Sequence, residues 1–192
     1  MFEHNGILLD TVSVMNLYAS DYIEEIVRAI PCEIAVSLDV KDEADYIFVG
    51  PAQNVTSRKK AVDLDPLHQS NVLTLIDYYT EEEATNIVNL AFEGMDNGEA
   101  VTCALALSRD WSIATDDRAA IRALTRLALP IKVVSTFDLI DWWVQFNYPD
   151  RNLVIEVLRN IWIRRRHKPE SSHPLFPIYS QVLSINKTSD KQ

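Results

Sequence analysis

Short apolar runs alternate with segments of helical periodicity along most of this chain. The apolar runs lie at residues 7–9, 34–37, 72–76, 111–115 and 131–134. Between them, apolar residues recur every three or four positions, as they do on one face of a helix. Strands that are separated by helices form a mainly parallel sheet with helices on both faces. The alternation therefore predicts an α/β fold.

Capping signals and prolines set the ends of the expected helices. Helices are expected near residues 12–18, 22–30, 38–48, 84–92, 99–108, 118–129, 136–143 and 152–163. Three pairs have the spacing of a capping box: Asp21 with Glu24, Thr80 with Glu83, and Ser135 with Asp138. Residues 50–70 have no clear period and indicate an irregular connection. The tail after Arg164 is expected to be loosely ordered.

The length of 192 residues fits one domain with a substantial core. We expect residues 1–146 to form this domain. Residues 147–192 would then be a C-terminal helical extension and tail, either part of the same globule or partly disordered.

Charge and composition limit the function classes. The net charge of −10 opposes nonspecific attraction to nucleic acid, so an RNA ligand would need a local basic surface or bridging metal ions. No run approaches the roughly 20 apolar residues of a membrane span, and the N-terminus has no export signal. Cys32 and Cys103 lie in apolar surroundings typical of reduced, buried thiols. These features predict a cytoplasmic protein that has no membrane partner.

Acidic residues follow several of the expected strands. Asp10 follows the first apolar run, Asp116 and Asp117 follow the fourth, Glu99 opens a helix, and Glu43 lies one turn into another helix. In an open parallel sheet, ligands bind beyond the C-terminal ends of the strands. Carboxylates gathered there would repel one another unless a cation neutralised them. Carboxylate oxygens favour Mg²⁺ or Mn²⁺.

Each acid also has a purely structural explanation. Asp10 could cap the helix that follows it, and Asp116 and Asp117 could be an N-cap and a first-turn acid. Glu99 could complete a capping box with Asp96. Glu43 could lie on a solvated helix face. No single position distinguishes a site from these alternatives.

The order and surroundings of the acids resemble those of PIN-like nuclease domains. The segment LLDTVSVMNL resembles the opening strand and helix of that family, and DNGEAVTCALALSRDWSIATDDRAAIRAL resembles the part that carries a Gly-Glu-Ala helix and an acidic pair. The segment IAVSLDVKDEADYI is a weaker match that makes Glu43 the candidate second acid, with Asp42 or Asp39 as alternatives in a shifted register. The resemblance covers roughly residues 6–140.

This resemblance implies an Mg²⁺- or Mn²⁺-dependent endoribonuclease, as in the toxins of toxin-antitoxin pairs. It implies that Asp10, Glu99 and Asp116 bind metal directly, and that Glu43 or Asp117 holds a second ion or orients the water. Thr11 and Thr115 flank two of these acids and could support a carboxylate or a bound water, or they could be plain capping residues. It also implies a homodimer and an antitoxin as partners.

Basic residues could bind the RNA, which we expect to be single-stranded. Arg118, Arg122 and Arg126 recur every four residues after the acidic pair. A second cluster lies beside Trp162 and is suited to phosphate contact and base stacking: Arg164, Arg165, Arg166, His167 and Lys168. This cluster could instead be a helix end followed by a solvated tail.

Other readings of the chain are weaker. A phosphatase of the haloacid dehalogenase type needs a second Asp two residues after the first, where this chain has Val12. A Rossmann domain needs a glycine-rich turn after its first strand, which the four glycines do not supply. The remaining alternative is an inactive PIN-like scaffold that binds RNA or protein and keeps the acids only as caps.

Overall fold

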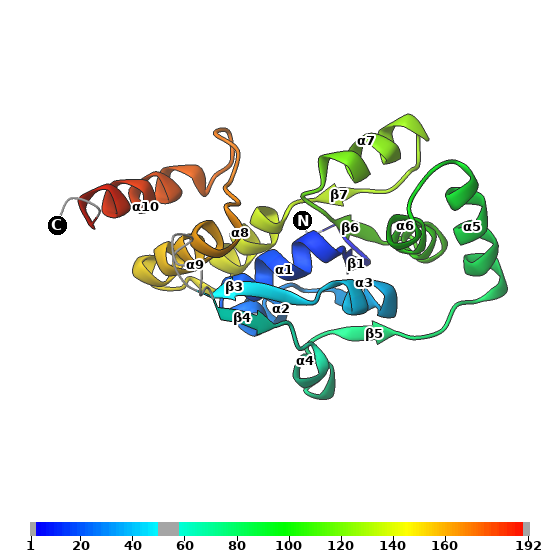
Figure 1. Ribbon diagram of the computed structural model, residues 1–192, viewed down its shortest axis with the longest axis horizontal. Coiled ribbons are helices and arrows are strands. Elements are labelled where there is room, and N and C mark those ends of the chain that lie inside the picture. Colours follow the sequence, from blue (N-terminus) through cyan, green and yellow to red (C-terminus); the bar gives the residue numbers. More distant parts are fainter. Residues whose placement is uncertain (1–2, 50–57, 190–192) are drawn as a thin grey trace.

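The computed structural model describes residues 3–49 and 58–189, and it contains the α/β architecture expected from the alternating pattern (Figure 1). The strands are β1 (Gly6–Leu9), β2 (Glu33–Ser37), β3 (Tyr46–Val49), β4 (Arg58–Ala61), β5 (Thr74–Ile76), β6 (Ser112–Ala114) and β7 (Val133–Val134). The helices are α1 (Thr11–Ala19), α2 (Ile23–Arg28), α3 (Leu38–Glu43), α4 (Asp65–Gln69), α5 (Glu81–Phe92), α6 (Asn97–Arg109), α7 (Arg118–Arg126), α8 (Thr136–Asn147), α9 (Arg151–Arg165) and α10 (Phe176–Ser189).

Five strands form one parallel sheet in the order β5-β2-β1-β6-β7. The chain first builds outward from β1 through β2 to β5, and then returns to place β6 on the other side of β1. Strand order therefore reverses between β1 and β6. Such a switch point leaves a crevice beyond the C-terminal ends of the two strands, which is where ligands bind in open α/β sheets.

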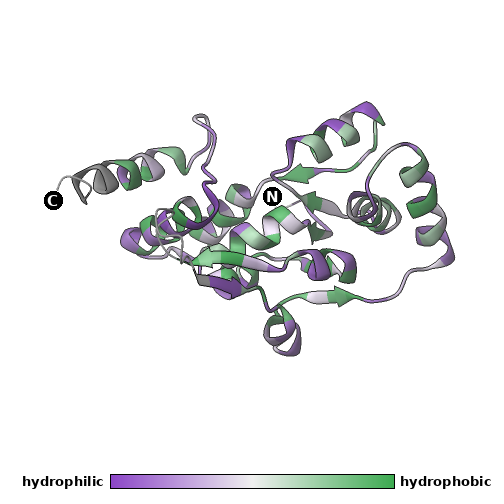
Figure 2. Ribbon diagram, in the orientation of Figure 1, coloured by the Kyte–Doolittle hydropathy of each residue, from purple (hydrophilic) through white to green (hydrophobic). Residues whose placement is uncertain are grey.

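The central strands alternate their side chains between two apolar cores. Ile7 and Leu9 join one core with residues of α1, α2, α8 and α9, whereas Leu8 joins the other with residues of α6. This is the two-residue period of a strand that is buried on both faces. The hydropathy colouring shows the apolar strands between helices that carry hydrophilic residues on their outer sides (Figure 2). The prediction of a parallel sheet with helices on both faces is confirmed.

The region after β2 differs from the expected single helix at 38–48. Helix α3 ends at Glu43, and Tyr46–Val49 instead forms β3, which pairs antiparallel with β4. Aromatic and β-branched side chains favour a strand once a partner strand is available. The irregular connection expected over residues 50–70 is likewise wrong for 58–61 and 65–69, which form β4 and α4. Residues 50–57 lie outside the described part of the chain.

Two of the three expected capping boxes are confirmed. Thr80 with Glu83 and Ser135 with Asp138 each make both reciprocal hydrogen bonds. The box expected at Asp21 is wrong, because α2 begins one residue later than that box requires and has Tyr22 at its N-cap. Asp21 has a left-handed φ of 67°. Its carboxylate contacts the guanidinium of Arg164 at 2.6 Å and the ammonium of Lys60 at 3.6 Å.

The C-terminal segment is more ordered than the sequence suggested. Helix α9 packs on α1 and β3, and α10 packs on α9. Leu175, Tyr179 and Val182 are buried in the same core as β1. The expectation of a loosely ordered tail after Arg164 is therefore wrong for residues 175–183, which pack on this core. None of the helices within the described ranges is both long and apolar enough to cross a membrane.

Candidate metal-dependent active site

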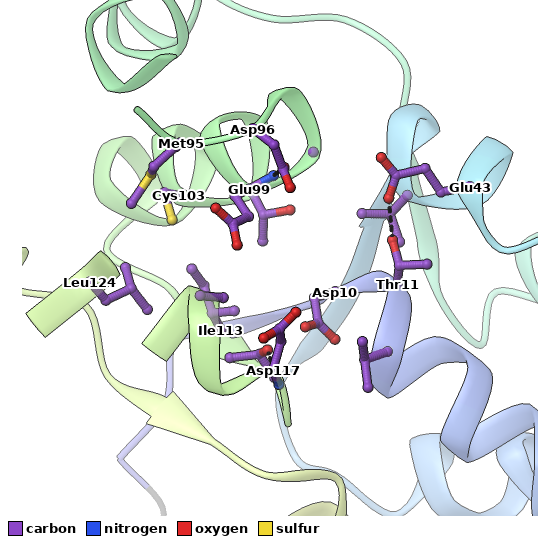
Figure 3. A pocket seen from close by; sticks show the side chains of 16 residues that line it. Asp10, Thr11, Glu43, Met95, Asp96, Glu99, Cys103, Ile113, Asp117 and Leu124 are labelled. Carbon is purple, nitrogen blue, oxygen red and sulfur yellow. Dashed lines mark hydrogen bonds between the residues drawn. The ribbon is translucent and has the colours of Figure 1, made fainter. Parts of the chain in front are cut away.

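A cavity of about 220 Å³ lies at the switch point between β1 and β6 (Figure 3). Sixteen residues line it, and they include carboxylates from four separate elements or their caps. The acids are Asp10, Glu43, Asp96, Glu99 and Asp117. No Lys, Arg or His of the described chain is among the lining residues. The cavity is thus a place where negative charge gathers without a protein cation to offset it.

Asp10 combines a structural role with a place in this pocket. As the N-cap of α1 it accepts a hydrogen bond from the backbone N–H of Ser13 at 2.6 Å. Burial raises the pKa of Asp10 to about 6, and the charge of Asp116 also raises it, although hydrogen bonds from Thr115 and Ser13 act in the opposite direction. A helix cap of this kind explains its position, but the raised pKa marks a carboxylate whose charge is poorly stabilised by the protein alone.

Glu99 points into the pocket from the first turn of α6, beside Asp96. The Asp96 side chain caps the helix by accepting a hydrogen bond from the backbone N–H of Glu99 at 2.8 Å. The Glu99 carboxylate itself lines the cavity (Figure 3). Its pKa is raised by burial and by the charges of Asp96 and Asp117. The structure therefore places the Glu99 side chain in the pocket.

Glu43 lies at the rim, at the end of α3. Its Oε2 accepts a hydrogen bond from the Thr11 hydroxyl at 2.6 Å (Figure 3). A Cβ atom on Gly98 would come within 2.8 Å of the Glu43 Oε1, so the glycine leaves room for this carboxylate against α6. Of the alternative registers, Asp39 instead accepts a hydrogen bond from the Tyr79 hydroxyl, and Asp42 is not among the residues lining the pocket.

Asp117, rather than Asp116, comes from the acidic pair into the pocket. It caps α7 by accepting a hydrogen bond from the backbone N–H of Ala119 at 2.6 Å. Thr115 supports the same turn, because its hydroxyl accepts a hydrogen bond from the backbone N–H of Asp117 at 3.0 Å. Asp117 therefore has both of the roles that the sequence left open, helix cap and pocket acid.

Asp116 does not line the pocket with the other predicted ligands, although its charge acts on Asp10 and raises the pKa of that carboxyl. Its carboxylate accepts hydrogen bonds from Asn16 Nδ2 at 2.9 Å and from the backbone and side chain of Thr136, and it lies 3.1 Å from His167 Nε2. The side chain is only 5% exposed. Burial by itself would raise the pKa of Asp116, but the contacts with His167, Thr136 and Asn16 outweigh burial and lower it. In extended backbone, successive side chains point to opposite sides, so only one of two neighbouring acids can face the pocket.

The predicted RNA-binding arginines lie in three different settings. Arg164 and Arg165 are largely structural, since Arg164 donates to the Ala19 carbonyl at 2.8 Å and Arg165 to the Asn16 Oδ1 at 3.3 Å. Arg118 and Arg166 line a second, larger cavity on the Asp116 side. Arg122 is exposed on α7 and is not among the residues that line either cavity.

Two features of this region were missed from the sequence. Asn16 was read as part of an ordinary helix, yet it is 1% exposed and contacts both Asp116 and Arg165. A polar residue on the buried face of α1 was the available signal, because buried polar groups need partners. The contact between His167 and Asp116, 51 positions apart, had no local signal.

The carboxylates surround the cavity without converging on one point. Within residues 3–49 and 58–189, no three His, Cys, Asp or Glu side chains are close enough together to hold a single ion. Comparison with protein-family models finds no match, and no curated protein matches the chain significantly. The likeness to PIN-like domains therefore remains a resemblance of motifs, and the fold that it implied is supported only as an α/β fold with a parallel five-stranded sheet.

Proposed function

We propose that this protein is an Mg²⁺- or Mn²⁺-dependent hydrolase that cuts RNA phosphodiesters at the pocket between β1 and β6. One observation carries the proposal: five carboxylates line a small cavity at the switch point of a parallel sheet, with no cation among its lining residues. The raised pKa values of Asp10 and Glu99 are the expected response of acids that lack a counter-charge.

The donor set fits a hard divalent cation. Asp10, Glu99 and Asp117 would hold it through carboxylate oxygens, and Glu43 and Asp96 would serve a second ion or orient water. A bound metal supplies Lewis acidity, lowering the pKa of an attacking water and offsetting charge on the phosphate. The chain contributes positions: three of its acids are fixed at or near helix N-termini, and the Thr11 hydroxyl holds Glu43. Binding would draw the carboxylates closer together than they now lie.

A second candidate function is an RNA- or protein-binding scaffold without activity. It is favoured by the structural partners of the acids, since Asp10, Asp96 and Asp117 all cap helices. Helix capping alone, however, does not explain why these acids line the same pocket, or why the charges of Asp96 and Asp117 raise the pKa of Glu99. The two candidates differ in whether divalent ions bind the pocket, and in whether RNA is cut.

The first test is cutting. Purified protein incubated with labelled single-stranded RNA and Mn²⁺ should produce fragments, and EDTA should stop the reaction. Asp10→Asn keeps a good N-cap but removes the charge, and it should slow cutting by about a hundredfold or more, because changing even the partners of metal ligands costs 10- to 100-fold. Cutting that persists in Asp10→Asn would come from a contaminant, and an intact RNA with wild-type protein would favour the scaffold.

The second test is binding of the ion itself. Mn²⁺ at about a hundred times its dissociation constant should stabilise the wild type by roughly 2.7 kcal/mol, which is about 5–10 °C for a chain of this size. Glu99→Gln should lose most of this shift in melting temperature. Glu93→Gln is the matched control, since Glu93 is exposed just after α5 and does not line the pocket. Equal shifts in wild type and Glu99→Gln would remove Glu99 from the ligand set.

A further inference from the structure

A second cavity of about 960 Å³ lies on the other side of the Thr115–Asp117 turn. It is formed by the start of α7, the start of α8 and the connection between α9 and α10. That connection is largely hydrophilic (Figure 2) and lies on the same side of the molecule as α7 (Figure 1). We call this cavity the basic groove, because the charged groups that it leaves without ion-pair partners are mainly cations.

Two of the acids in the basic groove are already engaged. Asp116 is held by Asn16, Thr136 and His167, as described above. Asp138 accepts the capping hydrogen bonds of Ser135 and lies 3.3 Å from His173 Nε2. Glu170 is the third acid that lines the groove, and it is exposed.

The cations of the groove, in contrast, have no ion-pair partner within the described part of the chain. Arg118, Arg166 and Lys168 are exposed, and none of them forms an ion pair with any other residue of the described chain. The Arg166 guanidinium lies 5.5 Å from the centre of the Trp162 ring, which limits where it can point. These three cations equal in number the three acids of the same cavity, but all three cations are exposed, whereas the Asp116 side chain is only 5% exposed. The exposed charges without ion-pair partners in the groove are therefore mainly cationic, which favours contact with phosphate groups.

The basic groove also adjoins the acidic pocket. Thr115 lines both cavities, and the next two residues diverge, with Asp116 in the groove and Asp117 in the pocket. Arg118 then follows in the groove. The pocket and the groove therefore lie on opposite sides of the same turn. The groove includes aromatic groups as well, among them His167, which stacks on Phe137 with ring centres 4.9 Å apart.

We infer that the basic groove binds the phosphodiester backbone of a single RNA strand next to the acidic pocket, through Arg118, Arg166 and Lys168. The inference rests on the proposed function for the identity of the strand, but the binding itself does not require cutting. Cationic grooves that track the backbone, with nearby aromatic rings, are how proteins hold single strands without reading sequence. The groove thus accounts for how an acidic protein could retain RNA beside a pocket of carboxylates.

The test measures binding in EDTA, so that neither metal nor cutting contributes. The groove variant replaces all three cations with glutamine: Arg118→Gln, Arg166→Gln and Lys168→Gln. The control variant makes the same change in net charge at three exposed cations outside both cavities: Lys59→Gln, Arg151→Gln and Arg159→Gln. Fluorescence anisotropy with a labelled, unstructured RNA oligonucleotide gives the dissociation constant at several salt concentrations, and thermal melts confirm that both variants fold.

The groove variant should bind about tenfold more weakly than wild type, and its logarithmic salt dependence should fall by about two, because each single-strand phosphate contact contributes about 0.7. The control variant should stay within about twofold. Equal weakening in both variants would mean that only overall charge matters and would overturn the inference, as would no weakening in the groove variant. If wild type binds RNA through the groove but never cuts it with Mn²⁺, the groove stands and the proposed hydrolase fails. If cutting occurs but the groove variant binds and cuts like the control, the hydrolase stands and the groove fails.

Discussion

Asp117→Asn should slow RNA cutting by about a hundredfold or more, whereas Asp116→Asn, one residue away, should keep the rate per folded molecule within about tenfold of wild type. The reason is the direction of the two side chains. Asp117 lines the acidic pocket, and Asp116 lies among Asn16, Thr136 and His167 on the other side of the turn. Asparagine at 117 can still cap α7, so the loss should be in activity and ion binding rather than in folding.

Asp116→Asn should instead destabilise the fold. The amide would turn a hydrogen-bond donor toward groups that now donate to a carboxylate, and it would remove the carboxylate that lies 3.1 Å from His167 Nε2. Removing one partner from a buried charged network costs about 2–4 kcal/mol, or roughly 5–15 °C in melting temperature for a chain of this length. Single-turnover cutting at 20 °C and thermal melts of both variants separate the two effects. A hundredfold loss of rate in a stably folded Asp116→Asn would show that Asp116, as the motif resemblance implied, acts in the reaction.

The sequence predicted the strands of the parallel sheet, though not their order, because each central strand is a short apolar run buried on both faces. Such runs carry their own signal, independent of distant contacts. The β3–β4 pair had no such signal. Tyr46–Val49 becomes a strand by pairing with Arg58–Ala61, a contact beyond any local window, and in isolation its spacing resembled the end of the helix at α3.

The C-terminal helix was missed for a different reason. Leu175, Tyr179 and Val182 have the spacing of one helical face and are all buried. The prolines and charged residues that precede them suggested a tail, yet that composition belongs to the connection between α9 and α10. The helical spacing was therefore present, but it was outweighed by the composition of its neighbours.

The search for acids near the C-terminal ends of the strands identified four acids that line the pocket: Asp10, Glu43, Glu99 and Asp117. The search could not choose between Asp116 and Asp117, because that choice depends on which way the backbone faces after Ala114, the last residue of β6. Asp96 was taken only as a cap. A single residue can cap a helix and line a pocket, since helix N-termini at strand ends point into the same crevice.

Asp10→Asn should make the protein more stable at pH 8 by about 1–2 kcal/mol, and this gain should vanish near pH 4. The pKa of Asp10 is about 6 in the folded protein, above its ordinary value of 3.8. A carboxyl group whose pKa is higher in the folded than in the unfolded state lowers the free energy of unfolding when it ionises. Below about pH 4 the carboxyl is protonated in both folded and unfolded states and has no such effect. As pH rises through 6, the unfolded state has already lost the proton, and the folded state must hold a buried charge.

The size of the effect follows from the shift. Two pKa units correspond to roughly 2.7 kcal/mol, and the cost of burying the polar amide in place of the carboxyl reduces this to the smaller expected gain. Urea unfolding of wild type and variant at pH 4, 5, 6, 7 and 8 gives the difference directly. Asp10→Ser, which keeps a cap without a carboxylate, should give the same pH profile and so separates the charge from the amide. A difference that does not vary with pH would refute the raised pKa.

Divalent ions link this stability measurement to the proposed function. Mn²⁺ would stabilise the ionised carboxylate of the wild type and would leave Asp10→Asn largely unaffected, so saturating Mn²⁺ at pH 8 should close or reverse the gap between them. Mg²⁺ should act in the same way at higher concentration. If neither ion changes the difference in stability between the wild type and Asp10→Asn, metal does not stabilise the ionised Asp10 carboxylate. The pocket would then not be a metal site. A metal site built from unpaired carboxylates is expected to destabilise the protein when the ion is absent and to lose this destabilisation when the ion binds. Carboxylates that serve only as helix caps are not expected to destabilise the fold in this way.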